Sequence, residues 1–311
     1  MESVAVSNIS ADAHRRQGLL LATFGAIGFS GKAIIVKLAY RHGVDAVTLL
    51  TYRMLFSLPL FLALSWWSGR GKPRLTGRDV AVVVGLGFLG YYLSSFLDFA
   101  GLRYVSASLE RLILYLNPTL VLALSVFVFG KTVARAQIIA LAVSYAGVIC
   151  VFGSELSLSG ANVPLGALLV FCSTISYALY LTLSGQEVRR LGALRLTGLA
   201  TSVACVICIL QFLLLRPLST LVVDPAVIWL SVLNAIACTF APVLMVMMAV
   251  ERLGAAMAAQ AGTIGPVSTI LMAAVLLGEP FTGWVAVGTA LVLLGIWLLT
   301  RATAANSSHV A

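Results

Sequence analysis

Five charged residues stand inside stretches of the sequence that are otherwise apolar: Lys32, Arg53, Asp98, Glu110 and Arg111. An isolated charge at the centre of a lipid bilayer costs at least about 2.5–3.5 kcal/mol, so such residues pair with one another, contact water or bind a polar ligand. Their formal charges sum to +1, so pairing among them can be almost complete. The carboxylates can hold an ammonium group or a proton, and the cations can hold a carboxylate.

Two of these charges, Glu110 and Arg111, are adjacent in the stretch SASLERLILYLNP. On a helix their side chains point about 100° apart, so each needs its own partner. Asn117 shares the direction of Glu110, Tyr115 lies nearer that of Arg111, and leucine and isoleucine fill the opposite face. Only that apolar face can contact lipid, so both charges point into the protein. The pairing we predict first is Asp98 with Arg111, across the short turn between their segments.

Two other segments carry polar side chains on one face. The first set is Gly87, Tyr91, Ser94 and Asp98, and the second is Ser173, Tyr177, Tyr180 and Ser184. Both follow the spacing i, i+4, i+7 and i+11, which marks one face of an α-helix. A later segment adds Gln260 and Thr263, which either join the same site or only hold helices together.

The predicted site collects the side chains on these inward faces. Its members are Lys32, Tyr91, Ser94, Asp98, Glu110, Arg111, Tyr115, Asn117, Tyr177, Tyr180, Gln260 and Thr263. Structural roles compete with binding at several positions. Asp98 and Arg111 can equally clamp helices together, and Arg53 suits an ion pair or an interface anchor better than a ligand contact.

The composition requires a membrane around these segments. Of the 311 residues, 60% are hydrophobic and 10% are charged, and the mean hydropathy is +1.04. A soluble domain keeps about a quarter of its residues charged. The net charge of +9 is compatible with nucleic acid binding. However, basic residues of membrane proteins gather in cytoplasmic loops, so we predict a lipid bilayer and no nucleic acid as partner.

Ten apolar segments are close to the length of about 20 residues that spans a bilayer as a helix. They cover residues 17–38, 46–67, 79–100, 104–129, 134–153, 164–184, 193–215, 226–249, 253–277 and 283–301. We therefore predict an all-α integral membrane protein with ten transmembrane helices. A polar tail over 1–16 shows no signal-peptide pattern, and a second tail covers 302–311.

Lys and Arg residues orient the chain. If the N-terminus is inside, 13 of them fall in inner segments and four in outer segments. Cytoplasmic loops carry the excess of basic residues, so we predict that both termini are cytoplasmic.

The chain also repeats itself with a constant offset of 148 residues. The aligned pairs include Gly18 with Gly166, Ala107 with Ala255, Pro118 with Pro266, Gly130 with Gly278, Ala142 with Ala290 and Gly147 with Gly295. The repeats cover 17–153 and 164–301, joined by an external linker at 154–163. Each has five spans, an odd number, so the second is inverted. Inverted repeats are typical of transporters with a substrate site at the repeat interface; two fused copies of a structural protein are the alternative.

Three stretches resemble a known family. They are GEPFTGWVAVGTALVLLG at 278–295, its counterpart GKTVARAQIIALAVSYAG at 130–147, and SASLERLILYLNPT at 106–119. The first-half copy departs by having Lys131 and Thr132 in place of Glu279 and Pro280. The chain resembles the drug/metabolite transporter superfamily, EamA type, with the aromatic amino acid exporter (YddG-like) branch as a candidate closer relative. The resemblance implies a central cavity surrounded by the first, third, fourth, sixth, eighth and ninth spans. It also implies export of amino acids, other metabolites or drugs.

Other chemistry is not indicated by the sequence. All five cysteines lie in spans, and the three histidines lie outside them, so we predict no metal site in the membrane. No phosphate-binding loop is present, so we expect neither direct use of ATP nor a cofactor. Pro118 and Pro266 interrupt equivalent helices, since proline removes a backbone hydrogen bond, and we interpret them as hinges.

These features together favour a secondary transporter in a bacterial inner (plasma) membrane, working by alternating access. A zwitterionic amino acid needs a cation for its carboxylate (Lys32 or Arg111) and an anion for its ammonium group (Asp98 or Glu110). The tyrosines suit a neutral or aromatic side chain, and our hypothesis places Lys32 near the carboxylate. Export of a drug or another metabolite is an alternative.

An alternative from another class is an intramembrane enzyme acting on a lipid-linked substrate, with Asp98 or Glu110 as acid or base. The sequence leaves open whether a carrier of this kind is a uniporter, an exchanger or proton-coupled. It also leaves open whether the protein is a monomer or a homodimer.

The orientation is testable with a reporter fused to the C-terminus. Because basic residues are retained in the cytoplasm, a reporter that is active only in the cytoplasm should be active, and one that is active only outside should be silent. The same pair of reporters in the segment 216–225, between the seventh and eighth predicted spans, should give the opposite pattern. Activity of the external reporter at the C-terminus would contradict the topology.

Overall fold

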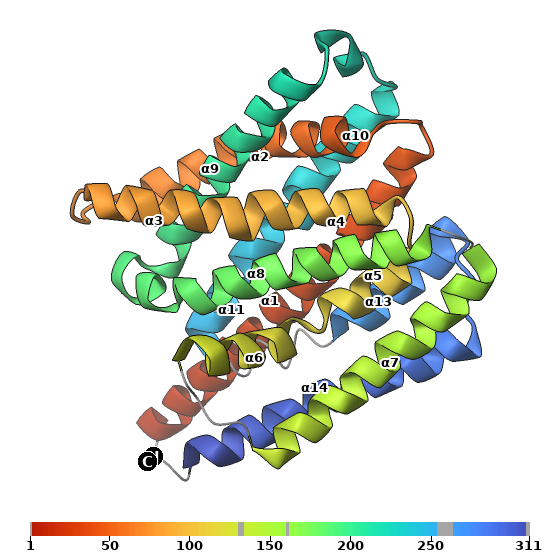
Figure 1. Ribbon diagram of the computed structural model, residues 1–311. Coiled ribbons are helices and arrows are strands. Elements are labelled where there is room, and N and C mark those ends of the chain that lie inside the picture. Colours follow the sequence, from red (N-terminus) through yellow and green to blue (C-terminus); the bar gives the residue numbers. More distant parts are fainter. Residues whose placement is uncertain (1, 130–133, 160–161, 254–263, 309–311) are drawn as a thin grey trace.

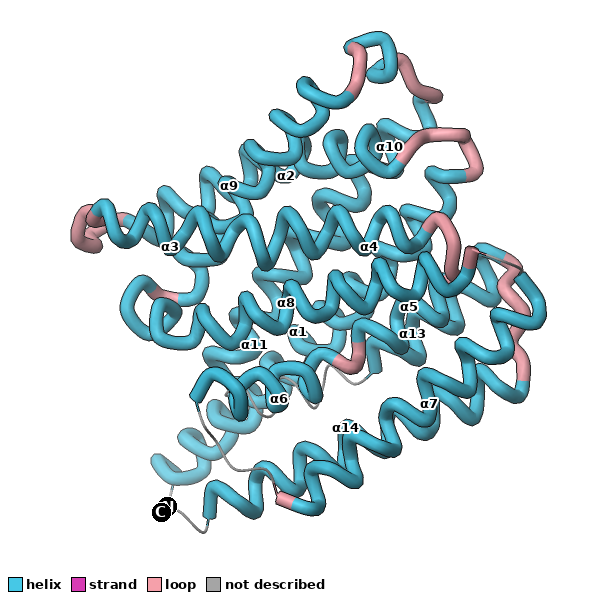
Figure 2. The backbone as a smooth tube through the Cα atoms, in the orientation of Figure 1, coloured by secondary structure: helices cyan, strands magenta, loops and turns pink. Residues whose placement is uncertain are grey.

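The computed structural model describes residues 2–129, 134–159, 162–253 and 264–308, and its regular structure over these ranges is entirely helical (Figures 1 and 2). The elements are α1 (Glu2–Tyr40), α2 (Ala46–Gly69), α3 (Gly77–Gly87), η1 (Phe88–Leu93), α4 (Ser94–Leu102), α5 (Ala107–Leu114), α6 (Asn117–Phe129), α7 (Arg135–Ser159), α8 (Val163–Leu191), α9 (Ala193–Leu215), η2 (Leu218–Leu221), α10 (Pro225–Ala235), η3 (Ile236–Phe240), α11 (Ala241–Leu253), α13 (Ile264–Met272), η4 (Ala273–Leu277) and α14 (Gly283–Ser308). Of the short segments, η1, η3 and η4 are π-helical and η2 is a 3₁₀ helix.

Nine helices within the described ranges are long and apolar enough to cross a membrane. The predicted ninth span is described only as the shorter apolar helix Ile264–Leu277, because residues 254–263 lie outside these ranges. The helices also run past the predicted boundaries: α1 begins at Glu2, α7 ends at Ser159 and α14 ends at Ser308. Helix propagation, which is easier than nucleation, accounts for these extensions into polar flanks.

The boundaries of the elements confirm the offset of 148 residues. The helix α3 begins at Gly77 and α10 at Pro225, and α7 begins at Arg135 and α14 at Gly283. One irregular segment also corresponds, since η1 begins at Phe88 and η3 at Ile236, whereas η4 aligns with the α-helical end of α6. The two repeats therefore share the course of most of their described helices.

The repeats pack against each other helix by helix. The main pairs are α1 with α11, α2 with α9, α4 with α8, and α7 with α14. Each pair takes one helix from each repeat, and Figure 1 shows α7 and α14 running side by side. Neither repeat thus forms a separate body, and the centre of the molecule is their shared interface.

Glycines bring α7 and α14 into direct backbone contact. A Cβ atom added at Gly147 would lie 2.6 Å from the carbonyl oxygen of Gly288, and one added at Gly288 would lie 2.6 Å from that of Gly147. At Gly295, the mate of Gly147, an added Cβ would lie 2.8 Å from the carbonyl oxygen of Ala140. Small residues at such crossings are typical of membrane helices, because lipid provides no hydrophobic drive for their association.

The tryptophans mark the two ends of the bundle. The start of α1 and the end of α14 lie at one end, here called the terminal end, and the turns 41–45, 103–106 and 216–224 lie at the other, the distal end (Figure 1). All five tryptophans are exposed. Toward the terminal end lie Trp66, Trp67 and Trp297, and toward the distal end lie Trp229 and Trp284. This is the distribution of the aromatic belts at membrane–water interfaces.

Replacement of Gly147 by Leu should separate α7 from α14. The new side chain would overlap the backbone of α14, and overpacking of this kind costs about 1–3 kcal/mol or more. The midpoint of thermal unfolding in detergent should therefore fall. Gly153→Leu is the matched control on the same helix, since a Cβ there meets nothing within 4 Å. Equal midpoints for the two variants would contradict this account of the packing.

Candidate functional site

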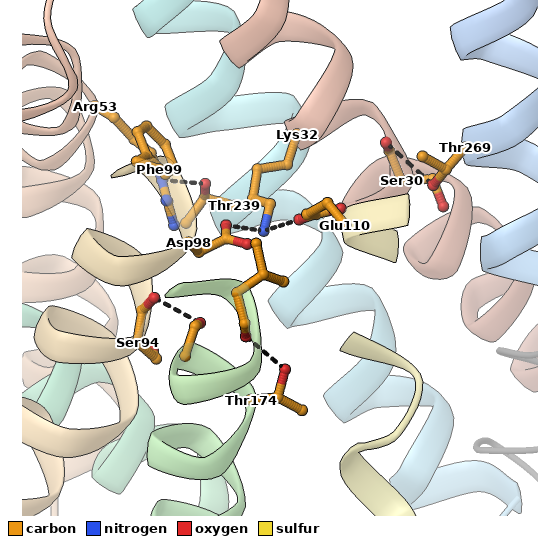
Figure 3. Close-up of polar contacts among 12 residues, drawn as sticks. Ser30, Lys32, Arg53, Ser94, Asp98, Phe99, Glu110, Thr174, Thr239 and Thr269 are labelled. Atoms are coloured by element: carbon orange, nitrogen blue, oxygen red, sulfur yellow. Dashed lines mark hydrogen bonds and ion pairs between the residues drawn. The ribbon is translucent and has the colours of Figure 1, made fainter. Parts of the chain in front are cut away.

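Lys32 lies between two carboxylates at the centre of the bundle. Its Nζ is 2.5 Å from Asp98 Oδ2 and 3.1 Å from Glu110 Oε1, as Figure 3 shows. The three residues come from α1, α4 and α5, and their side chains are 16%, 4% and 0% exposed. We call this group the ion triad. It brings together three of the residues that the sequence predicted for the site.

The start of α5 is fixed by an unusual set of caps, and this positions Glu110. Ser106 is the N-cap, and its hydroxyl accepts a hydrogen bond from the Leu109 amide. Glu155 accepts hydrogen bonds from the amide and hydroxyl of Ser106, and Glu279 accepts one from the Ala107 amide at 2.8 Å. The first amides of a helix have no partner within the helix, and carboxylates at that end are favourable. The caps thereby set which residue of α5 faces Lys32.

The ion triad keeps unused hydrogen-bonding capacity. Within the described ranges, the buried atoms Asp98 Oδ1 and Glu110 Oε2 have no hydrogen-bond partner. One lysine faces two carboxylates, so the group carries a formal charge of −1 when all three side chains are ionised. A buried acceptor without a partner is costly, and such atoms call for a ligand, a water molecule or a proton.

Arg111 does not pair with Asp98, so the first predicted ion pair is wrong. Its Nη2 donates to Ser30 Oγ at 3.1 Å, and its guanidinium lies 5.3 Å from the centre of the Tyr115 ring. The geometry explains the difference: Lys32 reaches Asp98 from α1, while Arg111 points to another side of α5. Its buried Nε has no hydrogen-bond partner within the described ranges.

Two residues that sequence reasoning missed complete the surroundings of Arg111. Ser30 donates to the carbonyl oxygen of Gly265 at 2.8 Å. A Cβ atom added to Gly265 would lie 2.5 Å from the Tyr115 hydroxyl and 2.7 Å from Arg111 Nη2, so a larger residue here would push the ends of both side chains away. A signal was present, because the repeat offset aligns Gly265 with Asn117 of the predicted site.

Arg53 serves as an anchor beside the ion triad. Its Nε donates to Thr239 Oγ1 at 3.1 Å, and its guanidinium lies 5.2 Å from the centre of the Phe99 ring. Figure 3 shows these side chains next to Asp98. Within the described ranges Arg53 forms no ion pair. It therefore links α2 and η3 to α4 through a neutral acceptor and an aromatic ring.

The tyrosines form a second cluster, separate from the ion triad. The hydroxyls of Tyr91 and Tyr180 lie 3.2 Å apart, and Tyr177 stacks on Tyr180 with ring centres 5.6 Å apart. Gly90 allows this approach, since an added Cβ would lie 2.4 Å from the Tyr180 side chain. Ser94 is engaged locally, because its hydroxyl donates to the carbonyl oxygen of Gly90. The fourth tyrosine of the prediction, Tyr115, lies beside Arg111 instead.

The repeat relates the tyrosine cluster to the ion triad. The offset of 148 residues aligns Lys32 with Tyr180, and Tyr91 with Thr239. Asp98 follows Tyr91 by seven residues on one span, which is about 10 Å along the helix, so the triad lies nearer the distal end. Equivalent backbone positions thus carry ions toward one end and tyrosines toward the other.

The remaining predicted residues lie at helix breaks or outside the described ranges. The fourth span is interrupted between Leu114 and Asn117, and Pro118 is the second residue of α6. Asn117 Oδ1 is buried without a partner there, among the described residues. Pro266 is the third residue of α13, and Gln260 and Thr263 fall in the undescribed segment 254–263. The hinge role of the two prolines stays a prediction.

Known proteins resemble this chain along nearly its whole length. It matches the EamA-like transporter family over residues 16–153 and again over 164–301. The uncharacterized transporter YcbK of Bacillus subtilis (strain 168) is 31% identical over 277 residues, which cover 84% of this chain and 86% of the relative. An uncharacterized transporter of Archaeoglobus fulgidus is 26% identical over 282 residues, 91% of this chain and 96% of the relative.

A solved structure described as "Crystal structure of protein" has a TM-score of 0.63 and 19% identity, and the match covers 92% of this chain and 98% of the other. At that identity the likeness shows the fold alone. The names of the relatives above state transport and give no substrate.

Replacing Lys32 by Met should destabilise the protein strongly. Removal of one partner from a buried ion pair costs about 3–5 kcal/mol, because the other partner stays charged in an apolar place. The triple variant Lys32→Met, Asp98→Asn, Glu110→Gln removes all three charges and should recover part of the lost thermal stability in detergent. Arg103→Met, at an exposed cation, is the control. An unchanged unfolding midpoint for Lys32→Met would show that the ion triad is not a stabilising contact.

Proposed function

We propose, from the membership of this chain in the EamA-like transporter family, that it is a secondary transporter exporting a neutral or aromatic amino acid by alternating access. The family supports transport, and the inverted repeat supports a substrate site between the repeats. The excess of basic residues in segments at the terminal end supports an inner membrane orientation with cytoplasmic termini. The substrate is argued from the side chains around α5.

One observation carries the choice of substrate: the two adjacent charges of α5 each keep an unused, buried polar atom of opposite kind. Glu110 Oε2 is an acceptor and Arg111 Nε is a donor, both without a hydrogen-bond partner in the described ranges. A zwitterion has an ammonium donor and a carboxylate acceptor a few bonds apart. It offers a partner of the right kind to each of these atoms, and charge-assisted hydrogen bonds are about twice as strong as neutral ones.

In this proposal Arg111, rather than Lys32 as in the hypothesis from the sequence, holds the substrate carboxylate. Lys32 is already held by Asp98 and Glu110, so it has no free charge to offer in this arrangement. Arg111 contacts only the neutral groups of Ser30 and Tyr115 in the contacts given above. Lys32 becomes a positioning residue that orients the two carboxylates toward the ammonium group.

Aromatic surface is available for the side chain of the substrate. Tyr115 lies against Arg111, next to the group that would hold the carboxylate. The cluster of Tyr91, Tyr177 and Tyr180 lies closer to the terminal end. Both contribute large apolar area with a polar hydroxyl, which suits a neutral or aromatic amino acid.

A cationic drug or another cationic metabolite is the competing substrate class. Such a compound would use the negative charge of the ion triad and the tyrosines, but it would gain nothing from Arg111. An enzyme of the membrane interior would use Asp98 or Glu110 as an acid or base. These alternatives predict different outcomes in one assay.

The test is counterflow in proteoliposomes, with phenylalanine compared with phenethylamine, the same molecule without a carboxylate. The parent should exchange labelled for unlabelled phenylalanine without chemical change. Arg111→Met should raise the concentration for half-maximal exchange by about 10- to 100-fold, because a hydrogen bond to a charged group contributes about 1.5–3 kcal/mol. Any exchange of phenethylamine should change much less.

Arg103→Met, on the exposed turn between α4 and α5, controls for loss of a positive charge. Equal effects of Arg111→Met on the two compounds would contradict the proposed role of Arg111. Preference for the amine would support a cationic substrate, and a converted product would support an enzyme.

A further inference from the structure

We propose that the protein binds the headgroup phosphate of an anionic glycerophospholipid at the terminal end of the bundle. The site lies between the segment 70–76, which joins α2 to α3, and the turn at Gly192, which joins α8 to α9. We call it the headgroup site. Its first part belongs to the first repeat and its second part to the second, so a bound lipid would bridge the repeats. The inference does not depend on which substrate the protein transports.

Hydrogen bonds from two cations hold the two parts of the headgroup site together. Lys72 Nζ donates to the carbonyl oxygen of Leu191 at 3.2 Å. Arg195 Nη2 donates to the carbonyl oxygen of Pro73 at 3.0 Å. Figure 1 shows the α2–α3 connection and the α8–α9 turn near each other at the left of the bundle. Because each bond crosses from one repeat to the other, the cations of the two repeats have fixed relative positions.

The cations of the headgroup site have no carboxylate beside them. In the part of the chain that the structure describes, no carboxylate oxygen lies within 4.0 Å of Arg70, Lys72, Arg74 or Arg195. Arg195 is 8% exposed, so water can hydrate only a small part of it. A buried charge is normally paired, and the charge of Arg195 has no counter-ion. A phosphate would supply one, because a guanidinium group is weakly hydrated and matches the geometry of phosphate oxygens.

The repeat offers an internal comparison, because the equivalent place at the distal end is electrically balanced. The offset of 148 residues relates 66–79 to 214–227, and 186–195 to 38–47. The two terminal segments together have seven basic and two acidic residues, a net charge of +5. The two distal segments have two of each and are neutral when their histidine is uncharged. Equivalent backbone positions therefore carry an excess of cations at one end alone.

Polar pairs across the repeat boundary close the distal place without any ligand. Arg216 Nη2 lies 3.1 Å from Asp45 Oδ1, and His42 Nδ1 lies 3.0 Å from Asp224 Oδ2. At the terminal end, both acidic residues of the two segments are engaged by a single arginine, Arg190. The other cations of the headgroup site, among the residues described, are thus left for an anion from outside the protein.

Aromatic side chains place the headgroup site at the membrane surface. Trp66 and Trp67, near the end of α2, are 65% and 63% exposed. The Arg70 guanidinium lies 3.8 Å from the centre of the Trp66 ring. Tryptophan prefers the level of the lipid headgroups, so the basic segment begins at that level. On α3, which follows the segment, Val80 and Val84 are exposed and would lie against an acyl chain.

An anionic phospholipid fits the site better than a zwitterionic one. The excess of cations attracts a headgroup phosphate, and it repels the ammonium group that phosphatidylcholine also carries. Basic pockets between transmembrane helices on the cytoplasmic side are known to bind anionic headgroups. The proposed orientation puts the headgroup site in the cytoplasmic leaflet, whose surface is negative.

The test measures quenching of tryptophan fluorescence by brominated lipids in phosphatidylcholine vesicles. The variant with Trp229, Trp284 and Trp297 replaced by Phe reports on Trp66 and Trp67 alone. Brominated phosphatidylglycerol should quench it at a mole fraction at least about fivefold lower than brominated phosphatidylcholine, the factor expected from one Lys or Arg near an anionic lipid. A variant that keeps only the two distal tryptophans should respond equally to both lipids. Equal quenching of the terminal pair by both lipids would overturn the proposal.

Single-charge variants locate the effect. Arg74 is exposed, so Arg74→Gln should fold normally and reduce the preference for phosphatidylglycerol by about fivefold. Arg195→Gln should reduce it further, because that charge is buried, and thermal unfolding in detergent reports whether this variant is folded. Arg103→Gln removes one exposed positive charge at the distal end and should leave the preference unchanged. A preference that survives both Arg74→Gln and Arg195→Gln would show that the phosphate binds elsewhere.

Inorganic phosphate distinguishes a lipid site from a site for a free anion. The preference for phosphatidylglycerol should persist in phosphate at the same ionic strength as a chloride control, because the membrane concentrates the lipid beside the site. Loss of the preference in phosphate alone would assign the site to a free anion and overturn the lipid assignment. Raising the ionic strength with either salt should weaken the preference gradually, since salt screens exposed charges. A preference that ignores ionic strength would contradict recognition by charge.

Discussion

The contact of Lys32 with Asp98 and Glu110 is the interaction on which the centre of this protein depends. It joins α1, α4 and α5, and it is the reason that two carboxylates can lie in an apolar interior. The capping of α5 by Glu155 and Glu279 fixes the depth at which Glu110 meets the lysine. Because the contact is costly to break and yet leaves acceptors unused, it is at once a structural clamp and a place where a charged ligand would be stabilised.

The inverted repeat gives the two ends of the bundle the same backbone and different chemistry. Pairs such as α1 with α11 and α4 with α8 are equivalent in geometry. Yet Lys32 corresponds to Tyr180, and the ion triad has no charged counterpart in the second repeat. A molecule moving along the interface would therefore meet ions toward one end and tyrosine rings toward the other.

Sequence reasoning predicted the spans, the offset of 148 residues and the inward direction of the charges, because hydropathy and helical periodicity determine these features locally. It chose the wrong partner for Asp98, since pairing depends on how far α1 reaches across the bundle. Sequence reasoning did not include Ser30 and Gly265 in the site, because neither has an unusual side chain. They belong to it because Arg111 approaches both of them closely. Gln260 and Thr263 lie outside the described ranges, so their place stays a prediction.

The paired π-helical segments η1 and η3 are informative about the evolutionary origin of the two repeats. The segments η1 and η3 begin 148 residues apart, at Phe88 and Ile236, so the same irregularity occurs in both halves. The simplest history is that a half-length ancestor already had it, before its gene was duplicated and fused. The charges of the ion triad, found in one half alone, were acquired or lost after that event. Fusion thus freed each half to mutate by itself, which two identical subunits encoded by one gene can never do.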